Sequence, residues 1–214
     1  MTLIVEASSL SLNDVHRFLK LEEISDGSFT NFLSLEPLSE FEQQDLLRIR
    51  NDFGCYLNAR KISEGLVKFI TFAPLMWLAG FYDVPIRLTM EDSIAIAVED
   101  EDRRITGRMD ILAINSFQSN IAPPFWVVVI ETKNSAIEVG QGLPQLLTYA
   151  FKSLEQQPSV WGLVTNGLRY QFVHLRHDEQ SNYQLMPLLS LNESPDAIEL
   201  LQVFKAICKL ANFQ

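Results

Sequence analysis

Cysteine and histidine are scarce in this sequence. Cys55 and Cys208 are the two cysteines among 214 residues, and they lie far apart without metal-ligand spacing. We therefore expect free thiols in a reducing compartment. His174 and His177 have neither a nearby cysteine nor a third ligand in the sequence, which argues against a zinc site.

Basic residues are also in deficit. The chain has 17 Lys and Arg against 27 Asp and Glu, which gives a net charge of -10 and a sequence pI of about 4.8. Such a surface does not attract polyanions over its whole area. If the protein meets nucleic acid, binding should be weak and local, and it should need a basic groove, a metal ion or a partner.

The sequence has no hydrophobic run of membrane-spanning length. Its most apolar stretch, residues 69–82, has about 14 residues, which is short of a bilayer span and typical of a buried core helix. Trp77 and Trp126 are expected in the core. The first ten residues contain no basic n-region and no long apolar h-region, so we expect no signal peptide, a cytoplasmic location and no membrane partner.

Repeats, low-complexity tracts and Gly/Ser linkers are likewise lacking, so the length predicts a single domain over residues 1–214. Helical spacing predicts helices in 11–23, 37–57, 62–80, 140–154 and 194–213, with Pro74 kinking the third. Strand patterns occur in 85–90, 94–102, 103–115 and 125–133, and Asn166-Gly167 predicts a hairpin within 160–177. This order predicts an α/β (α+β) fold, a mixed central sheet flanked by helices.

The central strand ends in polar residues. The apolar run from Phe125 leads into Glu131, Thr132 and Lys133. Residues i and i+2 of a strand share one face, so Glu131 and Lys133 should point the same way. Either they form a plain ion pair, or they hold something between them.

A second acid interrupts a neighbouring strand pattern. Asp110 lies within the β-rich run 103–115, and two buried acids brought together repel each other unless a cation lies between them. Mg²⁺ is usually held by one or two carboxylates, with water and phosphate completing its coordination. Asp110 and Glu131 could supply these carboxylates and Thr132 a backbone carbonyl, while Lys133 could orient a water and neutralise a phosphate.

Asp110 followed by Glu131-Thr132-Lys133 resembles the PD-(D/E)xK nuclease signature, with Met109 where the name of the motif has proline. The sequence GLPQLLTYA contains Gln145-x-x-x-Tyr149, which is similar to the Q-x-x-x-Y motif of RecB-like nucleases and of the nuclease domain of type I restriction R subunits. Glu64 occupies the place of the acid that many members carry on the first core helix. The resemblance covers roughly residues 62–172.

The resemblance implies a restriction-endonuclease-like fold with an N-terminal helical extension at 1–60 and a nuclease-like core at 61–214. It implies a metal-dependent endonuclease that hydrolyses DNA phosphodiester bonds. Asp110, Glu131, the Thr132 carbonyl and Glu64 would hold Mg²⁺ or Mn²⁺, and Lys133, Gln145 and Tyr149 would complete the catalytic set.

Two alternatives remain open. The chain could be a catalytically silent member of the fold that binds nucleic acid or a partner, or a subunit that docks onto a separate helicase or restriction complex. A homodimer is a further option. The sequence contains no G-x-x-x-x-G-K-[ST] phosphate loop, so we expect no ATP-driven translocation by this chain alone.

Overall fold

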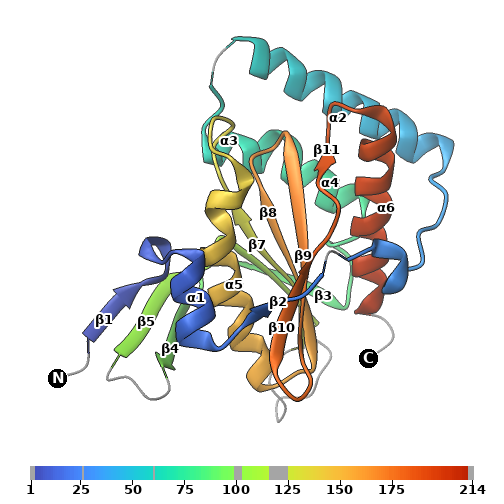
Figure 1. The fold of residues 1–214 in the computed structure, drawn as a ribbon. Coiled ribbons are helices and arrows are strands. Elements are labelled where there is room, and N and C mark those ends of the chain that lie inside the picture. Colours follow the sequence, from blue (N-terminus) through green and yellow to red (C-terminus); the bar gives the residue numbers. More distant parts are fainter. Residues whose placement is uncertain (1–2, 26, 60, 99–102, 116–124, 212–214) are drawn as a thin grey trace.

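The computed structural model describes residues 3–25, 27–59, 61–98, 103–115 and 125–211, and two sheets run through this part of the chain (Figure 1). The larger sheet has eight strands in the order β2-β10-β9-β8-β7-β6-β3, with β11 paired to β9, and the smaller has three in the order β1-β5-β4. The pairs β7–β8 and β2–β10 are parallel and the other pairs of the larger sheet are antiparallel. The strands are β1 (Leu3–Glu6), β2 (Glu22–Glu23), β3 (Ile86–Met90), β4 (Ser93–Val98), β5 (Arg103–Arg108), β6 (Ile111–Asn115), β7 (Phe125–Thr132), β8 (Ser159–Thr165), β9 (Arg169–His177), β10 (Ser181–Leu185) and β11 (Leu189–Ser190).

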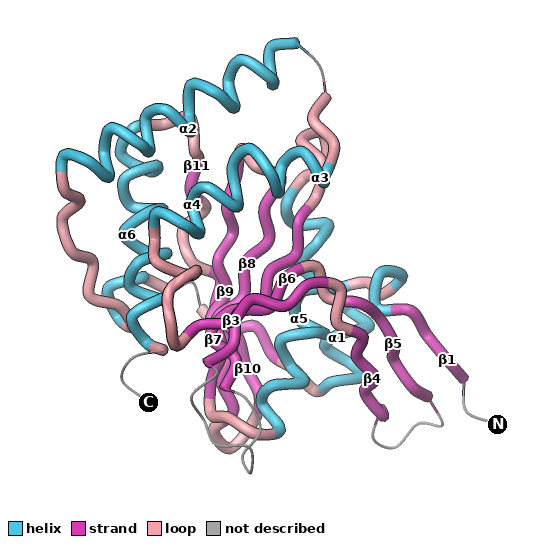
Figure 2. Tube along the Cα trace, turned by 180° about the vertical axis from the view of Figure 1, so that it is seen from behind, coloured by secondary structure: helices cyan, strands magenta, loops and turns pink. Residues whose placement is uncertain are grey.

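Helices cover both faces of the larger sheet, as Figures 1 and 2 show from opposite sides. One face packs against α2, the α3–α4 helix and α6, and the other packs against α1, α5 and the smaller sheet. This arrangement confirms the predicted mixed sheet flanked by helices. The helices are α1 (Leu12–Leu19), α2 (Glu40–Ala59), α3 (Glu64–Val67), α4 (Ala73–Leu78), α5 (Leu143–Phe151) and α6 (Ser194–Leu210).

Strand β7 lies in the middle of the larger sheet and is buried on both sides. Val128 and Ile130 belong to the core cluster under α2, α4 and α6, whereas Val129 belongs to the cluster under α1 and α5. Because alternate side chains face opposite layers, both sets have to be apolar. The continuous apolar run thus confirms the prediction of a doubly covered central strand.

The predicted strand 103–115 is wrong as a single element. Its first half is β5 of the smaller sheet and its second half is β6 of the larger sheet, with Met109 and Asp110 between them. A period-2 pattern does not reveal a change of sheet, because both halves alternate in the same way. The preceding strand, β4, ends at Val98, and the rest of its predicted range, 99–102, lies outside the described residues.

The predicted helix 62–80 forms as α3, a π-helical turn (η3, Lys68–Phe72) and α4. Pro74 is the second residue of α4, just beyond the wide turn, and it has no N–H to donate to the hydrogen-bond ladder there. Gly80, at φ 92°, follows the end of α4. Trp77 is 57% exposed, so its predicted place in the core is wrong. The helix buries one face against the sheet, and Trp77 lies on the other.

The first 60 residues supply strands as well as the predicted helices α1 and α2. Strand β1 pairs in parallel with β5, and β2 pairs in parallel with β10. Neither strand was expected, because two to four residues are too few for a recognisable alternation. The end of the predicted helix 11–23 is wrong, since α1 ends at Leu19, Lys20 is in the left-handed region, and Glu22 and Glu23 form β2. Phe29, Leu33 and Leu46 of this segment share a core cluster with Trp161 of β8.

The hairpin predicted at Asn166-Gly167 is confirmed: β8 and β9 pair in antiparallel register on either side of it. Gly167 has φ 85°, and the Asn166 side chain accepts hydrogen bonds from the N–H groups of Leu168 and Arg169. No helix among the described residues combines the length and apolar character needed to cross a bilayer.

Candidate active site

A polar cleft of about 690 Å³ lies where the end of β7 meets the smaller sheet. Its walls come from β1, α3, η3, β4, β5, β7 and α5, so segments distant in sequence share it. Six of the side chains that line it were singled out from the sequence. The residues that line it include Glu64, Lys68, Glu91, Gly107, Arg108, Asp110, Glu131, Lys133, Gln145 and Tyr149.

Asp110 lies in the bend between β5 and β6 rather than on a strand as predicted. The register that sets Ile111 opposite Ile130 places Asp110 opposite Glu131, just beyond the β6–β7 ladder. Asp110 Oδ2 accepts two hydrogen bonds from Thr132, one from its N–H at 2.8 Å and one from its Oγ1 at 2.7 Å. Thr132 therefore holds one oxygen of Asp110, and Oδ1 remains to face the cleft.

Glu131 and Lys133 share one face of the strand end, as residues two apart should. Lys133 Nζ donates to Glu131 Oε1 at 2.6 Å. Glu131 is 2% exposed, and its Oε2 is buried without a hydrogen-bond partner among the described residues. Burial and the nearby Asp110 charge raise the pKa of Glu131 to about 7, against the opposing effect of Lys133.

Gln145 and Tyr149 extend this arrangement along α5. Lys133 Nζ donates to Gln145 Oε1 at 3.1 Å, and Gln145 Nε2 donates to the Tyr149 hydroxyl at 2.9 Å. The backbone N–H of Arg108 donates to the same hydroxyl at 3.2 Å. A Cβ on Gly107 would lie 2.8 Å from the Tyr149 ring and hydroxyl, so the close approach of β5 to α5 needs glycine there. The chain of bonds therefore connects Lys133 to the smaller sheet.

Glu64 reaches the cleft from the first turn of α3. Ser63 caps this helix through a bond to its Oγ from the N–H of Leu66 at 3.4 Å. One turn later, Lys68 Nζ donates to Glu64 Oε1 at 2.9 Å and lies 3.0 Å from Asp110 Oδ1. Burial lowers the pKa of Lys68, but its hydrogen bonds with Glu64 and Asp110 outweigh this, and the pKa is raised overall. Lys68 was missed from the sequence, and its i,i+4 spacing from Glu64 was the available signal.

The structure brings the predicted residues Glu64, Asp110, Glu131, Lys133, Gln145 and Tyr149 to one cleft. Thr132 was predicted to contribute its backbone carbonyl. The hydrogen bonds that join Thr132 to the site are instead donated to Asp110 by its N–H and its hydroxyl. Among the described residues, no group of three or more His, Cys, Asp or Glu side chains is set to hold a metal ion. Ammonium groups occupy the carboxylate oxygens instead, Lys68 at Glu64 and Asp110, and Lys133 at Glu131.

The donor set nevertheless fits a divalent cation. Burying a carboxylate oxygen without a partner is unfavourable unless something compensates its charge. Glu131 Oε2 is such an oxygen, and Asp110 and Glu64 are hard oxygen donors in the same cleft. Mg²⁺ and Mn²⁺ prefer ligands of this kind.

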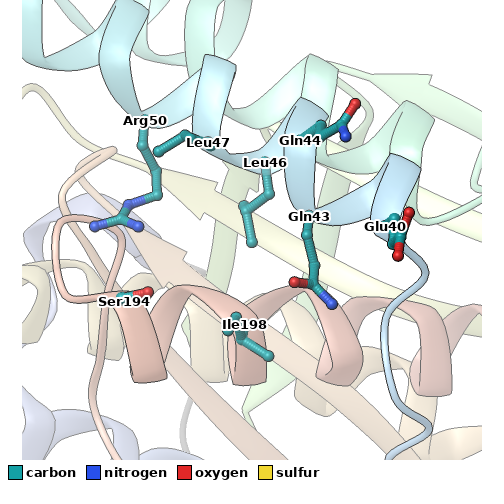
Figure 3. A pocket seen from close by; sticks show the side chains of 8 residues that line it. All are labelled: Glu40, Gln43, Gln44, Leu46, Leu47, Arg50, Ser194 and Ile198. Atoms are coloured by element: carbon teal, nitrogen blue, oxygen red, sulfur yellow. The ribbon is translucent and has the colours of Figure 1, made fainter.

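A separate hollow of about 350 Å³ lies between α2 and α6. Figure 3 shows Leu46 and Gln43 pointing from α2 toward α6, where Ile198 lies, and Arg50 pointing toward the turn before Ser194. Arg50 donates to the carbonyl of Asn192 at 2.6 Å. This lining resembles a helix-packing groove, and it lacks the converging carboxylates of the first cleft.

Comparisons with known proteins give little to add. No family model and no curated protein matches the sequence. Among the solved structures that match is the fragment structure of a putative HsdR subunit of a type I restriction enzyme from Vibrio vulnificus, at 18% identity and a TM-score of 0.38. The match covers 66% of this chain and 26% of that one. At this level it carries no argument about function, which has to come from the cleft.

Proposed function

We propose that this chain is a Mg²⁺- or Mn²⁺-dependent endonuclease domain that hydrolyses DNA phosphodiester bonds, related to the nuclease domains of type I restriction R subunits. The observation that carries the proposal is the environment of Glu131. Its carboxylate is buried, is opposite Asp110, has a lysine at 2.6 Å, and leaves one oxygen without a partner among the described residues. A purely structural ion pair would not need a second acid and an open polar cleft beside it.

Asp110 and Glu131 would hold the metal ion, with Glu64 and the Thr132 carbonyl as further oxygen donors. The ion would act as a Lewis acid on the scissile phosphate and on an attacking water. Thr132 positions Asp110 through its two hydrogen bonds, so that Oδ1 faces the cleft.

Lys133 is the group we assign to the transition state. Two of its three N–H donors are used by Glu131 and Gln145, and the third is left for a phosphate oxygen or a water. Gln145 and Tyr149 hold the ammonium in place from α5 and the smaller sheet. A fixed positive charge of this kind stabilises negative charge that develops during hydrolysis.

The test is cleavage of supercoiled plasmid DNA by the purified chain in Mg²⁺ or Mn²⁺, with EDTA as the first control. Asp110→Asn and Glu131→Gln should each remove both cleavage and Mn²⁺ binding, because each removes a ligand charge. Glu155→Gln is the matched control variant, since Glu155 pairs with Lys152 at the same 2.6 Å but at an exposed site. Cleavage that persists in EDTA, or in both acid variants, would refute the proposal.

The catalytically silent alternative is favoured by one observation, the occupation of the site's carboxylates by Lys68 and Lys133. Such a protein would bind a partner or nucleic acid without hydrolysing it. Mn²⁺ binding that depends on Asp110 and Glu131, with no cleavage of any DNA, would favour this alternative. Docking onto a separate helicase or restriction-complex subunit and homodimer formation stay predictions.

A further inference from the structure

Lys68 is a half-buried cation inside the carboxylate cluster. It begins the π-helical turn between α3 and α4, and its side chain is 19% exposed. Its Nζ lies 2.9 Å from Glu64 Oε1 and 3.0 Å from Asp110 Oδ1. These oxygens belong to two of the three acids that the proposed function assigns to the metal ion.

The hydrogen bonds of Asp110 determine which of its two carboxylate oxygens can face a cation. Thr132 occupies Oδ2 with both its N–H and its hydroxyl, so Oδ1 is the oxygen left to face a cation. Lys68 binds that same oxygen. An ammonium group and a divalent ion sharing one carboxylate oxygen repel each other strongly at such short range, particularly where water is scarce.

We propose that Lys68 is a tethered internal cation that neutralises Glu64 and Asp110 in the metal-free protein and is displaced from Asp110 when a divalent ion binds. The inference rests on the proposed function, because it concerns the same site. Lys68 sets the metal affinity by competition, and it is a positioning residue rather than a ligand, since a protonated lysine has no lone pair. Its long, flexible side chain reaches solvent at the cleft and can withdraw there.

Competition between Lys68 and the metal ion can be distinguished from a purely structural role of Lys68. If Lys68 competes with the metal, Lys68→Met should lower the melting temperature in EDTA and yet bind Mn²⁺ more tightly, by at least about fivefold in Kd. If Lys68 were only a support for the helix, the same variant would lose stability and bind Mn²⁺ equally well or less well. A lower melting temperature in EDTA together with a higher affinity for Mn²⁺ is expected only if Lys68 competes with the metal ion.

The experiment is isothermal titration of the full chain with Mn²⁺, together with melting curves in EDTA and in saturating Mn²⁺. Lys68→Gln is the second variant, because an amide can still donate to Glu64 and Asp110 without carrying charge, which protects the test if Lys68→Met folds poorly. Lys68→Arg keeps the positive charge, so this variant should bind Mn²⁺ no more tightly than the wild type. Lys152→Met is the matched control, since it removes an exposed lysine paired with Glu155.

Each outcome decides something. If the neutral Lys68 variants bind Mn²⁺ more tightly than the wild type does, the inference is supported. If these variants bind Mn²⁺ and the wild type does not, the inference is also supported, but metal-dependent catalysis by the native chain is overturned. Equal or weaker binding by the variants overturns the inference, but leaves the proposed function standing if Glu131→Gln abolishes wild-type binding. Absence of Mn²⁺ binding in every protein overturns both.

Discussion

At the scale of single residues, Glu131 is a buried acid with one oxygen that has no partner among the described residues. It is buried at the end of a central strand, and its pKa is raised from an ordinary value of 4.5 to about 7, first by burial and then by Asp110. An acid in this state is partly protonated at neutral pH in the metal-free protein. Stability and metal binding should therefore both depend on pH near neutrality.

We predict that the metal-free protein loses stability as pH rises from about 4.5 through 7. Between these values the folded protein retains a proton on Glu131 that the unfolded chain has released, so the folded state is favoured most at the acid end. The pKa difference corresponds to roughly 3 kcal/mol. Urea unfolding of the wild type and Glu131→Gln in EDTA, across pH 5–8, measures it.

The difference between the two unfolding curves isolates Glu131, because other titrating groups contribute to both. The difference in free energy of unfolding between the wild type and Glu131→Gln should change by a few kcal/mol between pH 5 and 8. The control variant Glu155→Gln should show the same pH dependence as the wild type. If the difference in free energy of unfolding stays constant with pH, Glu131 titrates in the ordinary range of a glutamate.

Lys133 gives a second prediction at this scale. Lys133→Met should reduce DNA cleavage about a hundredfold, or about 3 kcal/mol, because a positioned charge in the transition state is lost. Removing the ammonium also raises the pKa of its partner Glu131 further. Mn²⁺ binding therefore has to be compared over a pH series, so that the changed protonation of Glu131 is separated from the loss of the Lys133 charge. Unchanged cleavage in the variant would remove Lys133 from the mechanism.

At the scale of elements, the approach of α5 to the strand ends holds the site together. Gly142 immediately precedes α5, and a Cβ there would lie 2.6 Å from Val164 Cγ1 of β8 and 3.1 Å from Lys133 Cε. The helix can thus begin directly against β7 and β8. This contact brings Gln145 within hydrogen-bond reach of Lys133.

We predict that Gly142→Ala destabilises the protein by about 1–3 kcal/mol, as overpacking does, and lowers cleavage because Lys133 has to shift. Gly140 supplies a matched control in the same 3-10 turn, since a Cβ there meets nothing within 4 Å. Gly140→Ala should stay within about 0.5 kcal/mol of the wild type. Melting curves and plasmid cleavage measure both effects, and equal behaviour of the two variants would contradict the packing argument.

The break between β5 and β6 matters at the same scale. Asp110 is a ligand candidate because the chain leaves the smaller sheet at Met109 and enters the larger one at Ile111. The N–H of Glu91 donates to the Asp110 carbonyl at 3.3 Å, and that of Met109 to the Asp92 carbonyl at 2.9 Å. A change of sheet, rather than a position within a strand, therefore aims the Asp110 side chain toward Thr132 and the cleft.

At the scale of the whole molecule, charge limits what the protein can bind. The net charge is -10, and acids outnumber bases in the cleft itself. Its lining has Lys68, Arg108 and Lys133 beside five acids, Glu6, Glu64, Glu91, Asp110 and Glu131. Arg108 pairs with Glu91 at 3.4 Å on the cleft edge, where both side chains are exposed. The net negative charge opposes the binding of a polyanion unless a local site offsets it.

We predict that the isolated chain binds duplex DNA weakly, with a Kd well above the roughly 10⁻⁸ M typical of specific complexes at physiological salt. Affinity should fall steeply as salt increases, because the attraction comes from few phosphate contacts. Fluorescence anisotropy with a labelled duplex in Ca²⁺, across a salt series, measures both. Nanomolar binding at about 150 mM salt would contradict the prediction and point to a basic surface that the net charge does not suggest.

The sequence by itself determined the elements whose signal is local. The apolar run of β7 required two covered faces, Asn166-Gly167 required a turn, and the spacing of Glu131 and Lys133 required one shared face. These features depend on backbone periodicity and on side chains within a few residues of each other. They appear in the structure as predicted because tertiary contacts reinforce them.

Tertiary structure alone decided what joins distant segments. It split 103–115 between two sheets, recruited β1 and β2 from the first 23 residues, and exposed Trp77. It also brought Lys68 onto Asp110, a pairing across 42 residues of sequence (110 minus 68) that no local pattern encodes. Which sheet a strand joins and which carboxylate a lysine meets depend on packing summed over the whole core, so they cannot be obtained from the periodicity of any one segment.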